Sequence, residues 1–555
     1  MTTKRAGGGA HYMISAVAQK YNIHPQTLRL YERDALDRLA DANGQFCAAL
    51  YDRTEHRLML VTDRLASFPL HLWEGDGEVA FATQICTLLG HPRVPRRSDP
   101  LAIAELFTMQ RTIGQTTPIA DVRALPAACI FTVDPDGTRE RRYWHLTWRS
   151  PDFDEDEGAG LLADALRRAA ERQRDDRTLG LLLSGGVDSR MVLAACNGAP
   201  PVCWTTASFA ENPELDLARR TAAMFGAEHH ALIVDPPSTL DVLDSTVIES
   251  SGLYPASTPM SVFLPAVGEH CGVALTGHGL DYTLRGYYLP ARFLEVAGSR
   301  TRLPVLRPIA MRPNGGDVLE NLRQGPPRST IDRIVRSEFH ERWWRGQAEA
   351  MDEVLAPWLG SDEPYNAWDA FILHAVSKHY AFTGMMAVRA VCDLAMPSLD
   401  NDVFDVYLRM PPAWRCSGRI AQKALRQLSD AAADLPNANT DFRADLDPWL
   451  QIGGLLGRGA LQRLGLMRRH ATPTAIHSAG SWQNIPRLYR DDPAHRAHFA
   501  AIRSRLDPLA PGILDTDGLA ECIDEHLDGR ANHAKLMRQL LTHDSWVRST
   551  GVTTA

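Results

Sequence analysis

The sequence predicts an α/β protein in which an antiparallel β domain precedes a doubly wound parallel sheet and a helical C-terminal part. Between residues 179 and 276, short apolar runs alternate with helical stretches, which is the pattern of a parallel sheet. Residues 44–83 instead alternate polar and apolar side chains between turns, as antiparallel strands do. A chain of 555 residues is long enough for several domains with ample core.

The predicted parallel sheet uses four strands, and their loops define the region of interest. We expect strands at residues 179–183, 202–206, 230–234 and 273–276, with helices at 191–196, 214–225 and 240–249. In such a sheet the ligand lies across the carboxyl ends of the strands. The loops that follow these four strands are therefore the candidate binding site.

The loop after the first of these strands reads Ser184-Gly185-Gly186-Val187-Asp188-Ser189-Arg190. Its glycines are expected to take positive φ and approach a ligand, while the next helix directs its free N–H groups into the same space. The two serines add hydroxyl donors, and Asp188 adds a carboxylate of the kind that Mg²⁺ prefers beside phosphates. The loop predicts a site for a nucleoside triphosphate with Mg²⁺, and a glycine turn with a solvated aspartate is the alternative. The closing Gly-Lys-Ser/Thr of a Walker loop is absent.

This segment resembles the pyrophosphate-binding loop of AMP-forming ATP pyrophosphatases, and among them the synthetase half of class B asparagine synthetases, β-lactam synthetases and lasso-peptide cyclases. The resemblance implies ATP and Mg²⁺ as cofactors, adenylation of a carboxylate and attack by an amine. The contacts to ATP that it implies come from Ser184, Gly185, Gly186, Asp188, Ser189, Arg190, Thr205 and Gly277. For Thr205 the alternative to a nucleotide contact is an ordinary turn at the end of a strand. For Asp216, which lies beyond it, the alternative is a solvated aspartate at the start of a helix.

The loop after the fourth strand, Gly277-His278-Gly279-Leu280-Asp281, is similar to the G-E-G-x-D-E element of asparagine synthetases. In that element the aspartate is a metal ligand, which implies that Asp188 and Asp281 share Mg²⁺. His278 stands where those synthetases carry glutamate. A histidine there suits a general base because its ordinary pKa is close to neutrality, and a structural role is the alternative.

Two cations are candidates for stabilising the departing pyrophosphate. Lys423-Ala424-Leu425-Arg426 resembles the K-x-x-L-R helix of the synthetases, and Leu435-Pro436 with Arg443 resembles the loop that follows, but no lysine comes after it. Arg443 or Lys423 is therefore expected to take that role. A solvated helix charge is the alternative for Lys423.

Residues 41–150 are similar to the later half of the glutaminase domain of asparagine synthetases. The earlier half, which would carry an N-terminal cysteine nucleophile, is missing, and the first cysteine, Cys47, lies inside a predicted strand. An N-terminal nucleophile uses its own α-amine as base, so Cys47 cannot replace it. We expect a degenerate domain without glutaminase activity.

The ends of the chain complete the predicted domain order. Residues 1–40 resemble the helix-turn-helix of MerR-family regulators, with His24, Gln26, Thr27 and Arg29 as the exposed readers. One helix pair supplies few phosphate contacts, so nucleic acid is not an expected partner and a packing role is the alternative. Residues 151–450 form the synthetase-like domain with an insertion at about 290–366, and 451–555 form a helical extension.

Composition excludes several other classes. The net charge of −8 gives no reason to expect a nucleic-acid or membrane partner for the whole chain. The nine cysteines contain no C-x-x-C pair, which fits a reduced cytoplasmic protein and not a zinc or disulfide framework. No apolar run has the length of a membrane span.

Three functions fit these observations. The first is amide formation as in lasso-peptide cyclisation, which would imply a peptide substrate, a precursor and a protease partner. The second is an asparagine synthetase that uses free ammonia. The third is a DNA-binding regulator with a vestigial nucleotide domain.

Overall fold

The computed structural model describes residues 36–553 except 76, 175, 197, 209–210, 236–237, 255–259, 287, 297–298, 361–362, 439, 464–483 and 510–511. The predicted helix-turn-helix, with its four exposed readers, lies outside the described residues. Among the described helices, none combines the length and apolar character needed to cross a lipid bilayer.

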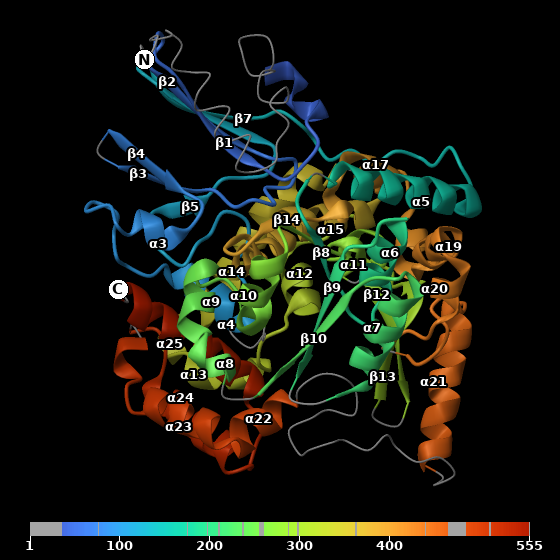
Figure 1. The fold of residues 1–555 in the computed structure, drawn as a ribbon. Coiled ribbons are helices and arrows are strands. Elements are labelled where there is room, and N and C mark those ends of the chain that lie inside the picture. Colours follow the sequence, from blue (N-terminus) through green and yellow to red (C-terminus); the bar gives the residue numbers. More distant parts are fainter. Residues whose placement is uncertain are drawn as a thin grey trace, which may run out of the picture.

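The first part of the chain forms two antiparallel sheets at one end of the molecule, as predicted (Figure 1). One sheet has the order β1-β2-β6-β7 and the other has the order β4-β3-β5. The strands are β1 (Cys47–Asp52), β2 (Arg57–Thr62), β3 (His71–Gly75), β4 (Glu78–Ala82), β5 (Val122–Ala124), β6 (Cys129–Asp134) and β7 (Gly137–Arg142). Between them lie α3 (Ile85–Leu88) and α4 (Pro100–Met109).

A buried carboxylate ties the start of this domain together. Asp63, just after β2, accepts hydrogen bonds from the backbone N–H groups of Phe46, Leu65, Ser67 and Phe68 and from the Ser67 hydroxyl. These donors offset the cost of burying the charge. The contacts hold the turn after β2 against the segment that leads into β1.

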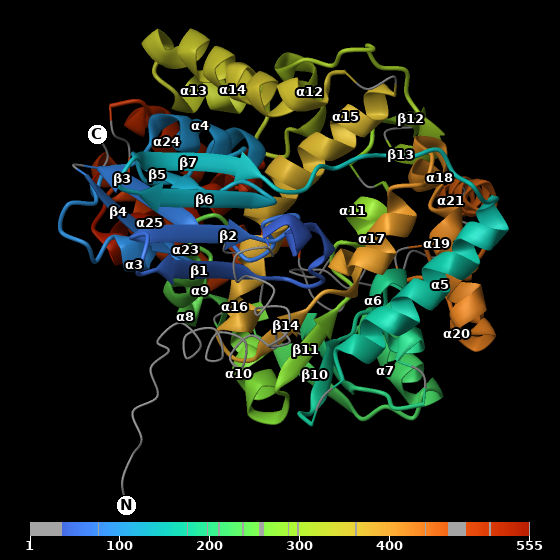
Figure 2. The ribbon, with the colours of Figure 1, turned by 90° about the horizontal axis from the view of Figure 1, so that it is seen from above.

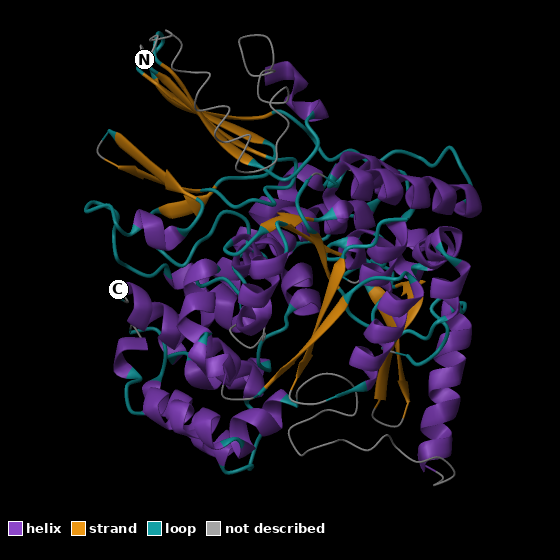
Figure 3. Ribbon diagram, viewed as in Figure 1, coloured by secondary structure: helices purple, strands orange, loops and turns teal. Residues whose placement is uncertain are grey.

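A five-stranded parallel sheet in the described residues forms the centre of the molecule (Figure 3). Its order is β10-β9-β8-β11-β14, and every neighbouring pair is parallel. The strands are β8 (Leu179–Leu182), β9 (Val202–Ser208), β10 (His229–Val234), β11 (Val273–Thr276) and β14 (Asp393–Ala395). The four predicted strands are confirmed, and β14 is an additional strand that the sequence did not reveal.

Helices cover both faces of this sheet, which confirms the doubly wound α/β class. Those that connect or cover the first strands are α5 (Glu155–Arg172), α6 (Val187–Ala195), α7 (Pro213–Met224), α8 (Ser238–Asp241), α9 (Leu243–Glu249), α10 (Met260–His270) and α11 (Leu280–Thr283). The main core gathers fully buried alanines and leucines of α5 against β8, α6 and β11. The apolar faces of these segments therefore set the sheet's position.

The segment predicted as an insertion carries regular structure. It contains the hairpin β12 (Ala291–Val296) and β13 (Ser299–Leu306), followed by α12 (Gly315–Leu322), α13 (Arg328–Ile334), α14 (His340–Leu355) and the start of α15 (Pro364–Phe371). Its helices contribute Trp343 and Ile331 to a second core. It is thus integral to the fold.

Helix α16 (Met386–Arg389) lies just before β14. The helices that follow β14 are α17 (Asn401–Tyr407), α18 (Pro412–Ser417), α19 (Arg419–Leu428), α20 (Asp430–Asp434), α21 (Pro448–Arg463), α22 (Ile485–Asp491), α23 (Pro493–Arg503), α24 (Thr516–Leu527) and α25 (Ala534–Thr550). Helix α21 stands along the edge of the molecule (Figure 1).

The last helices pack against several earlier parts of the chain. Side chains of α22–α25 share the second core with Phe107 of α4, Trp73 of β3 and Val247 of α9. In Figure 1 these helices lie below the N-terminal β domain, and Figure 2, seen from above, shows the strands of that domain in front of α23, α24 and α25. The C-terminal segment therefore bridges the antiparallel and parallel parts of the protein.

Candidate active site

Two loops meet at the carboxyl ends of β8 and β11, the central strands of the parallel sheet. These strands pair in register, with Leu182 opposite Thr276. The chain passes from β8 outward to β9 and β10 and then returns to β11 on the other side, which makes this point the topological switch of the sheet. Ligands of open α/β sheets bind in the crevice at that switch. The sequence prediction of one site built from both loops agrees with this topology.

Close packing, and not a positive φ, requires glycine at position 185 of the first loop. Gly185 and Gly186 do not have positive φ, and Gly186 has a φ of −77°, so that part of the prediction is wrong. A Cβ on Gly185 would lie 2.8 Å from the Ala438 Cβ and 3.0 Å from the Glu214 Cγ. Because Ala438 and Glu214 lie this close, a side chain at position 185 does not fit without a shift of its neighbours.

Hydroxyl groups organise the interior of the same loop. The Ser184 backbone N–H donates to the Ser189 Oγ across 3.0 Å, and the two hydroxyl oxygens are also 3.0 Å apart. The Gly186 N–H donates to the Ser184 Oγ across 3.1 Å, and the Gly185 N–H donates to Glu214 across 3.3 Å. These bonds shape a narrow turn at the N-terminus of α6, where N–H groups and the helix dipole favour an anion.

The second loop lies directly against the start of α6. A Cβ on Gly277 would lie 2.6 Å from both the carbonyl carbon of Asp188 and the backbone nitrogen of Ser189. Gly279 has a φ of +90°, a left-handed conformation that favours glycine, and the Ser398 hydroxyl donates to the His278 carbonyl across 2.6 Å. The glycines of this loop thus bring His278 and Asp281 to the helix that carries Asp188.

Asp188 and Asp281 form a half-buried acidic pair, and the positive charge of Arg285 acts on both carboxylates. Burial raises the pKa of both carboxyl groups, and the positive charge of Arg285 opposes that rise in each. The Arg285 Nη1 donates to the Asp188 Oδ2 across 3.1 Å. The Asp188 Oδ1 is buried and has no hydrogen-bond partner among the described residues.

This acidic pair fits a divalent cation completed by a ligand. A buried carboxylate oxygen without a donor is costly unless a cation or donor reaches it. No group of three or more histidine, cysteine, aspartate or glutamate side chains within the described ranges could hold a metal. Mg²⁺ is commonly held by one or two carboxylates together with substrate phosphates, so two carboxylates suffice for that arrangement.

His278 is held in its neutral form beside Asp188. Burial lowers the pKa of the imidazole to about 4, and Asp188 opposes this shift. Its Nε2 is buried without a hydrogen-bond partner in the part of the chain that the structure describes. The ring lies edge-on to Tyr282, with 5.7 Å between centroids. The lowered pKa makes the imidazole a weaker base than its ordinary value implies, but the unpaired nitrogen can still accept a hydrogen bond from an amine.

Arg190 is engaged by backbone carbonyls inside the fold, so its predicted contact with ATP stays a prediction. Its guanidinium is fully buried and donates to backbone carbonyls of Ala432 (3.1 Å), Leu435 (3.2 Å), Gly185 (3.2 Å) and Pro436 (2.7 Å). Burial lowers its pKa to about 10. Arg190 instead fastens the glycine loop to the segment after α20.

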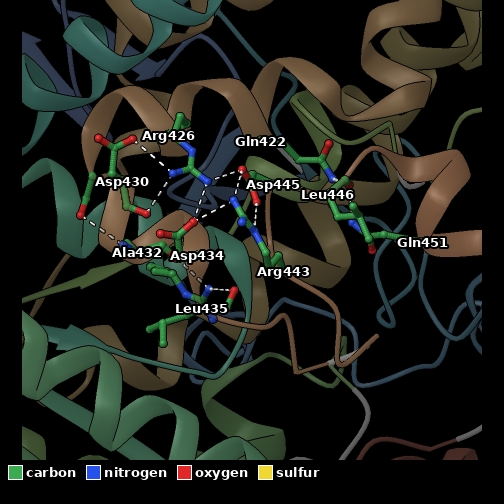
Figure 4. Close-up of polar contacts among 12 residues, drawn as sticks. Gln422, Arg426, Asp430, Ala432, Asp434, Leu435, Arg443, Asp445, Leu446 and Gln451 are labelled. Carbon is green, nitrogen blue, oxygen red and sulfur yellow. Dashed lines mark hydrogen bonds and ion pairs between the residues drawn. The ribbon is translucent and has the colours of Figure 1, made fainter. Parts of the chain in front are cut away.

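Lys423 and Arg443 are both engaged by carboxylates. The Lys423 Nζ lies 2.7 Å from Asp156 at the start of α5. Arg443 is largely exposed, lies 2.8 Å from Asp434 and is held by Asp445, which also pairs with Arg426 (Figure 4). Each would have to leave its acidic partners to reach a nucleotide, so their catalytic roles stay predictions.

Thr205 is buried in β9 and its hydroxyl has partners within the fold. The Oγ1 lies 2.9 Å from the Leu183 carbonyl, to which it donates, and 2.8 Å from the His229 Nε2. Thr205 therefore ties β9 to the residue before the glycine loop. Asp216 lies in the first turn of α7 and is exposed.

Sequence reasoning assigned no role to Arg285, Glu214 or Ser398, all of which contact the two loops. The available signal for Arg285 was its spacing, four residues after Asp281 and just beyond the short helix α11. Glu214 and Ser398 are remote in sequence from the loops they contact. Only the fold brings those two together with the site.

The fold and the loops define a nucleotide-type parallel α/β domain joined to an amidotransferase-like β domain. Residues 161–439 match the asparagine synthase family, and residues 26–144 match the glutamine amidotransferase domain. The chain belongs to the asparagine synthase family, whose members are ATP-dependent ligases that form amide bonds.

Curated relatives agree with this placement. Asparagine synthetase [glutamine-hydrolyzing] 1 of Bacillus subtilis (strain 168) is 25% identical over 454 residues, which cover 77% of this chain and 71% of the relative. A putative asparagine synthetase of Mycobacterium tuberculosis (strain ATCC 25618 / H37Rv) is 26% identical over 459 residues, with coverages of 74% and 69%. Carboxyethyl-arginine beta-lactam-synthase of Streptomyces clavuligerus is 29% identical over 273 residues, with coverages of 47% and 50%.

Proposed function

We propose that this protein uses ATP and Mg²⁺ to adenylate a carboxylate and then joins the acyl group to an amine, as in lasso-peptide cyclisation. The observation that carries the proposal is the meeting of Asp188, Asp281 and His278 at the switch point, with unpaired buried atoms on Asp188 and His278. In this reaction a peptide side-chain carboxylate is the acid and the same peptide's N-terminal amine is the nucleophile. A precursor peptide and a protease would then be its partners.

The chemistry proceeds in two steps that these residues support. A carboxylate oxygen attacks the α-phosphorus of ATP, the bond between the α-phosphorus and the bridging oxygen breaks, and pyrophosphate leaves. The amine nitrogen then attacks the acyl carbon, the bond to AMP breaks, and the proton lost by nitrogen moves to His278. The N-terminus of α6 and the serine hydroxyl groups bind the phosphates, and Mg²⁺ held by the two aspartates would neutralise their charge.

The N-terminal domain supports an amine donor other than glutamine-derived ammonia. Cys47 lies within β1, where burial and the charge of Asp63 raise the pKa of its thiol to about 12. A thiol in that state is a poor nucleophile, because the thiolate is the reactive form. Cys47 also lacks the free α-amine that an N-terminal nucleophile uses as base.

Pyrophosphate release tests the proposal directly. The purified protein is incubated with Mg-ATP alone, with aspartate and ammonia, with aspartate and glutamine, and with synthetic precursor peptides encoded near its gene. Release only with a peptide, together with a product lighter by one water, supports the proposal. Pyrophosphate release in the absence of any acid would contradict the proposed reaction. Glutamate formed from glutamine would overturn the proposed loss of glutaminase activity.

An ammonia-using asparagine synthetase is the second candidate, because relatives covering about three quarters of the chain carry the name asparagine synthetase. In that case aspartate and ammonia alone yield AMP, pyrophosphate and asparagine. The same assay therefore separates the two candidates.

A further inference from the structure

We propose that Arg285 is the cation that binds the departing pyrophosphate, the role for which the sequence offers no loop lysine. The inference rests on the proposed adenylation and names a residue of that same site. It begins from where the guanidinium lies. Arg285 follows α11 and donates to Asp188 across 3.1 Å, at the N-terminus of α6 where the phosphates are expected.

The contact with Asp188 places the charge of Arg285 beside a carboxylate that is proposed to hold Mg²⁺. The Asp188 Oδ2 accepts from the guanidinium, and the Oδ1 is buried without a hydrogen-bond partner among the described residues. A divalent cation bound at this carboxylate would compete with the guanidinium for it. Once such a cation takes the carboxylates, the guanidinium can turn to phosphate oxygens, which it binds in bidentate fashion.

The backbone around Arg285 fixes the start of this side chain. Gly286 has a φ of +48° and a Cβ there would lie 3.1 Å from the backbone of Arg415. Gly418 lies beside the Arg285 side chain, with 3.8 Å from an added Cβ to the Cγ. The side chain itself is 35% exposed, so part of it is open to a ligand at the switch point.

The other cations considered for this role have different tasks in the structure. The Arg190 guanidinium donates to four backbone carbonyls. Lys423 is paired with Asp156, and Arg443 with Asp434 and Asp445. Of these arginines and lysines, Arg285 is the one in contact with a predicted metal-binding carboxylate.

Binding of inorganic pyrophosphate in the presence of Mg²⁺, measured by calorimetry on the full chain, tests this assignment apart from turnover. Arg285→Gln should weaken binding about 10- to 100-fold, the value of one lost charged hydrogen bond. Arg285→Lys should recover part of it, because the charge remains but the planar fork is lost. Arg345→Gln, at an exposed position on α14, is the matched control and should bind as the wild type does.

Unchanged pyrophosphate affinity in Arg285→Gln, with a normal melting temperature, overturns the inference. So does a loss of affinity in Arg443→Gln or Lys423→Gln that exceeds the loss in Arg285→Gln. If Arg285→Gln does not fold, the comparison of Arg285→Lys with the wild type decides, and equal affinities count against the inference. If the wild-type protein ligates but Arg285→Gln binds pyrophosphate normally, only the role of Arg285 is refuted. If the wild-type protein binds pyrophosphate through Arg285 but never ligates, only the proposed function is refuted.

Discussion

Gly277 and Asp188 are in backbone contact: a methyl group on the Gly277 Cα would lie 2.6 Å from the carbonyl carbon of Asp188. The contact joins the end of β11 to the first turn of α6. It sets the separation of the two loops before any side chain is considered. The acidic pair therefore depends on a glycine that makes no polar contact of its own in the proposed chemistry.

Gly277→Ala should separate the loops and abolish Mg-ATP binding. Overpacking of this kind costs about 1–3 kcal/mol of unfolding free energy. Urea unfolding and calorimetric titration with Mg-ATP measure the two effects. Gly453→Ala in α21 is the control. Nothing lies within 4 Å of a Cβ added there, so this substitution should not lower the stability. Normal ATP binding by Gly277→Ala would contradict the proposed site.

Asp188→Asn and Asp281→Asn should each lower pyrophosphate release at least about 100-fold, because each removes a carboxylate that would hold the Mg²⁺ bound to the phosphates. Both should also raise the Mg²⁺ concentration needed for half-maximal ATP binding. The exposed Asp164→Asn on α5 serves as the control and should leave both measurements unchanged. Full activity in either site variant at limiting Mg²⁺ would remove the carboxylate pair from the mechanism.

Arg190→Gln should destabilise the protein by at least about 3 kcal/mol, because a shorter side chain leaves several buried carbonyls without donors. Denaturant unfolding measures this loss. Arg443→Gln is the matched comparison, since Arg443 is exposed and its loss should barely change stability. If Arg190→Gln were as stable as the wild type but failed to bind ATP, the result would favour the predicted nucleotide contact over the structural role.

The strands that position the site could be predicted from the sequence because their evidence is local. Each of the four predicted strands is a short apolar run between turn residues, and glycine-rich loops follow two of them. The same local signals located Asp188, His278 and Asp281. Strand β14 was not predicted, because its three residues are too few to show a periodic pattern and its partner β11 lies far away in the sequence.

Other features depended on contacts between distant residues. The acceptors of Arg190 lie more than 240 residues away from it, apart from Gly185, so its task could not be read from its neighbours. The sequence did not show where the C-terminal helices pack, because their partners in the second core include α4 and β3, which lie far away in the sequence. Hydrophobic periodicity predicts that a helix has a buried face but not which segment covers it.

The second core also makes stability depend on pH through His543 of α25. His543 is buried, lies edge-on to Phe107 at 5.9 Å between centroids, and has its Nε2 3.3 Å from the Leu509 carbonyl. Burial lowers the pKa of the imidazole below its ordinary value of 6.5, and the carbonyl and Asp544 oppose this. The folded state thus keeps His543 neutral while the unfolded chain binds a proton. Its contribution to stability is present above pH 6.5 and is lost as the pH falls below that value.

Wild-type unfolding free energy should therefore fall between about pH 7 and 5, and the fall should be shallower in His543→Gln, because glutamine does not titrate. Urea unfolding at several pH values, followed by circular dichroism, gives both slopes. His56→Gln is the control, since His56 is exposed in the turn between β1 and β2 and should leave the slope unchanged. Equal slopes in His543→Gln and the wild type would show that other buried histidines, such as His495 and His526, carry the effect, because burial lowers their pKa values as well.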